Sequence, residues 1–184
     1  MDSFLTLDDI EEKFKDKIYK QDYTKKPFID GATVLPLRSI IGEDGSFCEL
    51  LRLNQQGEIG NIPGFKLGQV NRTELLGKVI KAWHLHFKQN ELWFVNPESN
   101  VLVGLLDLRK DSPTHGISSR LILGGGKTEL LLIPKGVAHG SANMTDKPTI
   151  IWYFIDQQFN PKDSDELRLH WDVLGHDFWE PIRD

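Results

Sequence analysis

The feature that most constrains the fold is a succession of short apolar runs between residues 33 and 159, which glycine, proline, asparagine and aspartate interrupt. Short runs at this spacing are typical of strands in an antiparallel sandwich or barrel. No segment between them has the length and periodicity of a crossover helix, so a doubly wound parallel sheet is disfavoured. The predicted strands cover residues 33–37, 46–53, 65–70, 79–87, 92–95, 101–108, 119–123, 129–133 and 149–155.

The segments on either side of this region have different patterns of apolar residues. In the N-terminal flank, Leu7, Ile10, Phe14 and Ile18 recur at steps of three and four residues, which predicts a short amphipathic helix. A chain of 184 residues suits one domain. We therefore expect a single domain over 1–184, with a helical extension (1–28), a barrel (33–159) and a tail (160–184). The tail carries spaced aromatic and apolar residues that predict loops and a helical turn lying across the barrel: Trp171, Leu174, Phe178 and Trp179.

The composition excludes several functional classes. The chain has 22 basic and 27 acidic residues and a formal charge of −5, so it lacks the basic surface that nucleic-acid binding needs. Its longest apolar run, 149–155, is far shorter than the roughly 20 residues of a membrane-spanning helix, and no signal peptide precedes it. A lone Cys48 can form no internal disulfide. We expect a soluble, cytoplasmic protein.

Two histidine-containing segments are candidates for chemistry. Residues 84–91 read H-x-H-x4-E, and the alternation of a strand turns His84 and His86 to the same face. Residues 134–143 read P-x-G-x2-H-x3-N around His139, which we interpret as a strand end that turns into a loop and back. Together they resemble the paired motifs of the cupin barrel. Imidazoles with one carboxylate suit a divalent transition metal, so His84, His86, Glu91 and His139 form a candidate metal site.

The sequence between and after these motifs resembles one family within the cupins more closely. Residues 107–116 read D-L-R-x-x-S-P-T-x-G, and residues 133–140 read I-P-x-G-x-A-H-G, with Tyr153 and then Asn160-Pro161 following. Segments 42–49, 69–71, 81–84 and 169–179 match further, weaker motifs, so the likeness extends from about Val34 to Pro181. The chain is thus similar to the dTDP-4-dehydrorhamnose 3,5-epimerase family. The resemblance implies a cupin fold, a double-stranded β-helix or jelly-roll barrel.

The resemblance also implies a function and roles for residues. In that family a histidine removes a proton beside the 4-keto group of a nucleotide-linked 6-deoxy sugar, and a tyrosine returns one from the opposite face, without a metal. His84 then corresponds to the base and Tyr153 to the acid, while His139 contacts substrate or polarises the ketone. The remaining candidates would bind the substrate: Phe47, Glu49, Gln69, Asn71, Lys81, His86, Gln89, Glu91 and Phe159. A homodimer and a role in deoxysugar or cell-surface polysaccharide biosynthesis are further expectations.

Several positions depart from the family pattern. Asp44 and Lys81 stand where that family has phosphate-binding arginines, and Phe159 replaces a tyrosine. Glu91 falls close to a family lysine that assists the enolate. The L-S-x-K-D segment that supplies the aspartate behind the catalytic histidine has no counterpart, so the resemblance leaves His84 without a carboxylate partner.

Three hypotheses remain open from the sequence. The favoured one is an epimerase or isomerase acting on a nucleotide-linked 4-keto-6-deoxy sugar, with no cofactor. The second is a metal-dependent cupin enzyme that uses His84, His86, Glu91 and His139. The third is a sugar-binding cupin without catalytic activity, because one fold serves many chemistries. Glu91 separates the first two hypotheses: it is a metal ligand in one, and in the other it is kept neutral or hydrogen-bonds a donor such as His84.

Overall fold

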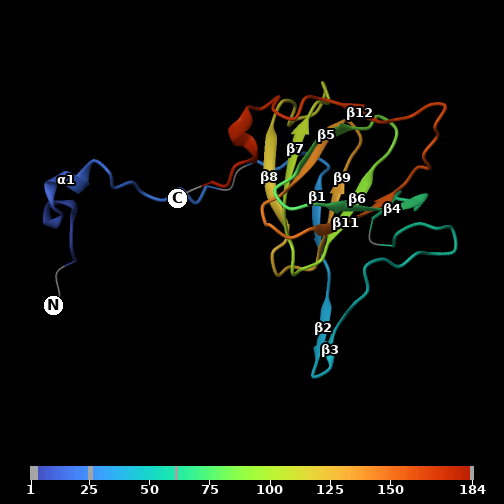
Figure 1. Cartoon of the computed structure of the whole chain (residues 1–184), viewed down its shortest axis with the longest axis horizontal. Coiled ribbons are helices and arrows are strands. Elements are labelled where there is room, and N and C mark those ends of the chain that lie inside the picture. Colours follow the sequence, from blue (N-terminus) through green and yellow to red (C-terminus); the bar gives the residue numbers. More distant parts are fainter. Residues whose placement is uncertain (1–3, 25–26, 61, 183–184) are drawn as a thin grey trace.

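The computed structural model describes residues 4–24, 27–60 and 62–182; parts of the predicted extension and tail, residues 1–3, 25–26 and 183–184, lie outside it. Its regular secondary structure in the described residues is almost entirely β-strand, which confirms the predicted all-β class (Figure 1). The strands are β1 (Thr33–Pro36), β2 (Ser39–Gly42), β3 (Gly45–Cys48), β4 (Gln69–Leu75), β5 (Ile80–Leu85), β6 (Glu91–Val95), β7 (Asn100–Asp107), β8 (Ser118–Gly124), β9 (Glu129–Ile133), β10 (Val137–Asn143), β11 (Thr149–Ile155) and β12 (Leu167–Arg168).

Two antiparallel sheets form the barrel within the described chain. One has the strand order β1-β9-β6-β11-β4 and the other β12-β5-β10-β7-β8. Their facing side chains form one buried cluster, to which β7 contributes Val101, Val103 and Leu105, and β11 contributes Ile151. Complete burial of such a side chain stabilises a fold by about 1.5–3 kcal/mol. This cluster therefore fixes the spacing of the two sheets.

The C-terminal tail covers the outer face of the second sheet. Trp179, at the end of a 3₁₀ turn (His176–Trp179), packs against Trp83 of β5 with ring centroids 4.9 Å apart. Phe178 lies 5.2 Å from the same tryptophan. Gly104 of β7 permits this packing, because a Cβ there would lie 2.6 Å from the Phe178 ring. The tail thus lies across the barrel, as its spaced aromatic residues predict.

The N-terminal segment differs from the prediction of one amphipathic helix. It forms a 3₁₀ turn (Leu7–Asp9) and a single helical turn, α1 (Glu12–Lys15), neither with a buried side chain. A capping box between Thr6 and Asp9 closes the first turn, and Ile10 is extended. Figure 1 shows this segment away from the barrel. Because isolated helices shorter than about 12–15 residues are marginal, an unpacked stretch of this length does not stay helical.

The segment before Asn143 differs from its interpretation as a strand end that turns into a loop and back. Residues Val137–Asn143 form β10, which lies between β5 and β7 and is buried throughout. A hydrophobicity pattern does not detect this strand, because most of its residues are small. They are small because β5 is close: a Cβ on Gly140 would lie 2.5 Å from the Ala82 side chain of β5. The close approach of β5 therefore explains why β10 consists mainly of small residues and not of large apolar ones.

Two predicted strands have different bounds in the structure. Of the predicted strand 46–53, only residues 46–48 lie in a strand, β3, which pairs with β2 in a hairpin that projects from the barrel (Figure 1). The predicted strand 65–70 begins later, as β4 (Gln69–Leu75). Among the described residues, no helix is long and apolar enough to cross a membrane.

Candidate active site

A cavity of about 660 Å³ opens between the two sheets. Its walls come from β4, β6 and β11 of one sheet, from β5 and β10 of the other, and from the segment 157–168 that leads into β12. This volume lies in the usual range for small-molecule sites. The predicted site residues on its wall are Gln69, Asn71, Lys81, His84, His86, Gln89, Glu91, His139, Tyr153 and Phe159.

His84 has a polar partner on each ring nitrogen. Its Nδ1 donates to Glu166 Oε1 at 2.6 Å, and its Nε2 accepts a hydrogen bond from Arg168 Nη1 at 2.7 Å. Both partners come from the tail, because β12 pairs with β5 and places Arg168 opposite His84 in the register. The carboxylate fixes the Nδ1–H tautomer and leaves a lone pair on Nε2. This arrangement suits a general base.

The surroundings of His84 keep the ring neutral. Burial lowers the pKa of His84, and the positive charge of Arg168 lowers it further. The carboxylate of Glu166 acts in the opposite direction and raises this pKa, but by less than the sum of the lowering effects. A neutral imidazole at physiological pH can accept a proton at Nε2, as proton abstraction needs, once that nitrogen no longer accepts from Arg168.

Tyr153 lies on the opposite sheet, in β11, and lines the same cavity. Burial raises the pKa of its phenol, so the hydroxyl keeps its proton. The ring packs edge-on against Trp93, with centroids 4.9 Å apart, and Trp93 in turn contacts His139 at 5.3 Å. A protonated phenol on one wall therefore faces a basic imidazole on the other.

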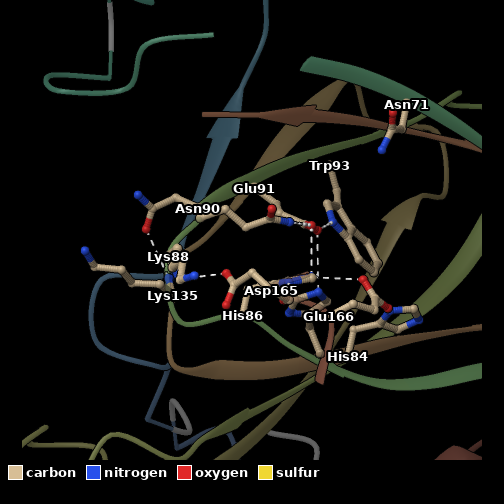
Figure 2. Close-up of polar contacts among 12 residues, drawn as sticks. Asn71, His84, His86, Lys88, Asn90, Glu91, Trp93, Lys135, Asp165 and Glu166 are labelled. Carbon is tan, nitrogen blue, oxygen red and sulfur yellow. Dashed lines mark hydrogen bonds and ion pairs between the residues drawn. The ribbon is translucent and has the colours of Figure 1, made fainter. Parts of the chain in front are cut away.

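A buried group of three titratable side chains lies deeper in the cavity. Glu91 Oε1 lies 3.3 Å from His86 Nε2, and its Oε2 lies 3.4 Å from His139 Nε2. Glu91 also accepts hydrogen bonds from Trp93 Nε1 at 2.6 Å and Gln89 Nε2 at 2.8 Å. In Figure 2, Glu91 points at His86 and Trp93, whereas Glu166 lies beside His84. Glu91 is therefore not the partner of His84.

The charges in this group follow from these contacts. Burial alone would raise the pKa of Glu91, but the hydrogen bond from His86 and the neighbouring imidazoles outweigh it and lower the pKa to about 2. Burial acts against the charged form of His86, but its hydrogen bond to Glu91 prevails and raises the pKa of His86. Burial lowers the pKa of His139 to about 4, so that ring is neutral. Glu91 is ionised and forms a buried pair with His86.

Two sets of side chains in the described residues could hold a metal ion. His86, Glu91 and His139 form one set, and His84, His86 and Glu166 form the other; the ligand atoms of each set lie within 4.8 Å of one another. Imidazole and carboxylate ligands are chemically suited to zinc or iron. The four-residue metal site expected from the sequence is not assembled as one group, because His84 is bound by Glu166 and Arg168 instead.

The remaining predicted substrate-binding residues fall into two places. Gln69 lies at the cavity wall, where its Oε1 accepts a hydrogen bond from the Phe159 backbone N–H at 2.8 Å, and its Nε2 donates to Asn71 Oδ1 at 2.9 Å. Phe47 and Glu49 lie on and beside the projecting hairpin, outside this cavity. Phe47 is 65% exposed, and among the described residues neither Phe47 nor Glu49 lines the cavity of its own chain.

Sequence reasoning did not identify Glu166, Arg168 or Trp93 as site residues. Glu166 and Arg168 lie in a polar stretch of the tail that reads as a solvated surface, 82 and 84 residues after His84. Trp93 reads as an ordinary apolar strand residue. One signal could have pointed to Glu166 and Arg168: they lie in the D-E-L-R stretch directly before Leu169, where the matched motif 169–179 begins.

Comparison with known proteins places this site in a family. The family model for dTDP-4-dehydrorhamnose 3,5-epimerase matches residues 27–182. The chain belongs to this family. It is 40% identical over 144 residues to the spore coat polysaccharide biosynthesis protein SpsL of Bacillus subtilis, an alignment that covers 78% of this chain and 91% of SpsL.

Solved structures of family members have the same fold. A dTDP sugar isomerase from Desulfovibrio desulfuricans G20 is 28% identical, with a TM-score of 0.67 over 84% of this chain and 91% of that one. The dTDP-4-dehydrorhamnose 3,5-epimerase of Bacillus anthracis, solved with TDP and PPi bound, is 25% identical with a TM-score of 0.67, over 83% of this chain and 87% of that one. The predicted cupin-type barrel is thereby confirmed, and this epimerase-family protein is a sugar epimerase.

Proposed function

We propose that this epimerase inverts a carbon next to the ketone of a nucleotide-linked 4-keto-6-deoxy sugar, for the synthesis of a cell-surface polysaccharide. One observation carries the proposal: His84, oriented by Glu166, lies in one sheet, and the protonated Tyr153 lies in the other, on the walls of one cavity. Inversion requires a proton to leave one face of the sugar and to return on the other. A base and an acid on facing sheets meet that requirement.

The proton transfers follow from the states of these groups. The lone pair on His84 Nε2 takes the proton from the carbon beside the ketone, and the electrons of the broken C–H bond move into an enolate. Glu166 holds the Nδ1–H and stabilises the imidazolium that forms. Tyr153 then donates its phenolic proton to the opposite face of the same carbon. Solvent restores the phenol, and the His84 imidazolium releases its proton to solvent. Burial of Tyr153 keeps that proton in place until the enolate forms.

We propose dTDP as the nucleotide and a homodimer as the acting form. The Bacillus anthracis enzyme was solved with TDP, which supports the nucleotide. The projecting hairpin supports the dimer, since Ile40, Ile41 and Phe47 are all more than half exposed on it. Exposed apolar side chains clustered in this way are typical of protein interfaces. In such a dimer, the hairpin would bring Phe47 and Glu49 to the cavity of the partner.

We keep the cytoplasm as the proposed location, because Cys48 has no partner for an internal disulfide.

We further propose that the reaction needs no metal. The guanidinium of Arg168 lies 2.7 Å from His84 Nε2, and its positive charge opposes a second cation at that nitrogen. Glu91, the other distinctive ligand, is already hydrogen-bonded by Trp93 and Gln89. Metal analysis of the purified protein tests this proposal. A stoichiometric transition metal that is lost together with activity in Glu91→Gln would overturn it.

The central test of the function is exchange with solvent deuterium. A dTDP-linked 4-keto-6-deoxyhexose incubated with the protein in D₂O should gain deuterium at a carbon next to the ketone, as followed by NMR. His84→Ala should abolish the exchange. His115→Ala is the matched control, because His115 is exposed and lies outside the cavity. Exchange at the wild-type rate in His84→Ala would refute the assignment of the base.

A further inference from the structure

The proposed reaction needs a group that its base and acid do not supply. When the proton leaves carbon, negative charge accumulates on the ketone oxygen, and donors already aimed at that oxygen lower the barrier. The family resemblance places an enolate-assisting lysine close to position 91, but this chain has Glu91 there. A carboxylate repels the developing charge. Another side chain must therefore carry this role, and the inference below rests on the proposed function.

Three donors on the cavity wall, His86, His139 and Lys88, are already engaged. His86 donates its Nδ1–H to the Asp165 carbonyl oxygen and directs Nε2 at Glu91. His139 donates its Nδ1–H to the Val137 carbonyl oxygen at 3.0 Å, and as a neutral ring it has no second N–H to offer a ketone. Lys88 is paired with Asp163. The notion that His139 polarises the ketone thus receives no support from its hydrogen bonds.

Arg168 is placed differently. Among the described residues, it is the cation that contacts the base itself, through Nη1 at 2.7 Å from His84 Nε2. Its side chain lines the cavity, is 56% exposed and has its Nε 3.4 Å from Glu166 Oε1. A guanidinium carries five N–H donors and stays protonated at any physiological pH. Arg168 therefore has unused donors, room to move and a permanent charge.

We propose that Arg168 is a catalytic residue that stabilises the enolate. In this structure its Nη1 occupies the position beside His84 Nε2 that a substrate C–H must take. The ketone carbon is bonded to the carbon that loses the proton, so the ketone oxygen of a bound sugar lies only two bonds from that carbon. A small displacement of the guanidinium moves its N–H from the base to that oxygen. The C–H proton goes to His84, the electron pair goes to the enolate oxygen, and Arg168 keeps all its protons.

The contact between Arg168 and His84 also affects the protonation of the base before and after substrate binds. While Arg168 donates to Nε2 at 2.7 Å, burial of the ring and then the positive charge of Arg168 lower the pKa of His84 and favour the neutral imidazole. After the displacement, the guanidinium stands near both the enolate and Glu166, and the new imidazolium has its nearest carboxylate on Nδ1. One side chain thus prepares the base and then stabilises the product of its action.

The test compares Arg168→Gln and Arg168→Lys with the wild-type protein in the deuterium exchange assay, with kcat and KM measured separately. Removal of an aimed donor typically costs about 10²–10³-fold in kcat. We expect that loss in Arg168→Gln with little change in KM, a smaller loss in Arg168→Lys, and partial recovery of Arg168→Ala by added guanidinium ion. Lys110→Gln, an exposed cation outside the cavity, is the control and should keep the wild-type rate.

The pH profile separates catalysis from a structural role. Loss of the cation raises the pKa of His84, so the acid limb of kcat/KM should move to higher pH in Arg168→Gln. An Arg168→Gln variant with the wild-type kcat would overturn the assignment of Arg168 and leave the proposed function standing. If the wild-type protein exchanges no deuterium, the proposed function is wrong and this assignment falls with it.

Discussion

Replacement of Glu166 by glutamine tests how much the epimerase gains from the carboxylate behind its base. The substitution keeps the size of the side chain and an oxygen that can accept the His84 Nδ1–H, so the tautomer is retained. It removes the negative charge that lies 2.6 Å from Nδ1 and that, in the proposed mechanism, stabilises the imidazolium formed by proton abstraction. Because this charge interacts more strongly with the protonated ring than with the neutral one, the loss falls on the transition state.

The size of the loss follows from the exposure of the pair. Two unit charges about 4 Å apart interact by about 1 kcal/mol in water and about 4 kcal/mol near a protein surface. The side chain of Glu166 is 42% exposed and that of His84 is 25% exposed, so solvent screens part of the interaction. A loss of about 1.5–3 kcal/mol is consistent with a hydrogen bond to a charged group. That range corresponds to about 10- to 100-fold in rate.

The assay is deuterium exchange beside the ketone over a range of pH. Glu166 raises the pKa of His84, so its removal lowers that pKa further and moves the acid limb of kcat/KM to lower pH. The direction is opposite to the one expected for Arg168→Gln. Glu74→Gln, an exposed carboxylate outside the cavity, serves as the control. A Glu166→Gln variant with an unchanged rate and an unmoved acid limb would refute the reasoning.

Three further predictions follow from the structure. Tyr153→Phe should keep the fold and substrate binding but lose turnover by about a hundredfold or more, the scale of general acid catalysis; a full-rate variant would make Tyr153 a packing residue. Gly104→Val should destabilise the protein by about 1–3 kcal/mol in urea unfolding, because the new side chain overlaps Phe178 and Trp179; an unchanged midpoint would show that the tail repacks freely. Light scattering at micromolar concentration should give twice the 21.1 kDa chain mass, and a monomer mass would contradict the proposed dimer.

Most strands of the barrel could be predicted from the sequence, and so could several residues that line its cavity. Strand alternation placed His84 and His86 on the same face, and both line the cavity. A short apolar run placed Tyr153 in a strand, and it lies in β11. These features are local, because side-chain direction in a strand follows from position alone. The homodimer and the roles of the site residues stay predictions.

The errors arose where long-range packing decides the structure. The segment that forms β10 reads as a strand end turning into a loop and back, since its glycine and alanines show no apolar run; contact with β5 requires small residues there. The periodicity predicts an N-terminal helix, but within the part of the chain that the structure describes no neighbour buries the face that contains Phe14. Glu166 could not be paired with His84 from sequence, because 82 residues separate them and only the pairing of β12 with β5 brings them together.

The two-residue strand β12 has a consequence for biosynthesis. His84 is translated long before Glu166 and Arg168, which reach it only once the tail has paired with β5, where Trp179 packs on Trp83. A nascent chain that has closed its barrel therefore still lacks the partners of its base. The ribosome must release the last aromatic residues before the enzyme can act. A chain that ends before Glu166 would thus lack both the carboxylate and the guanidinium that contact His84.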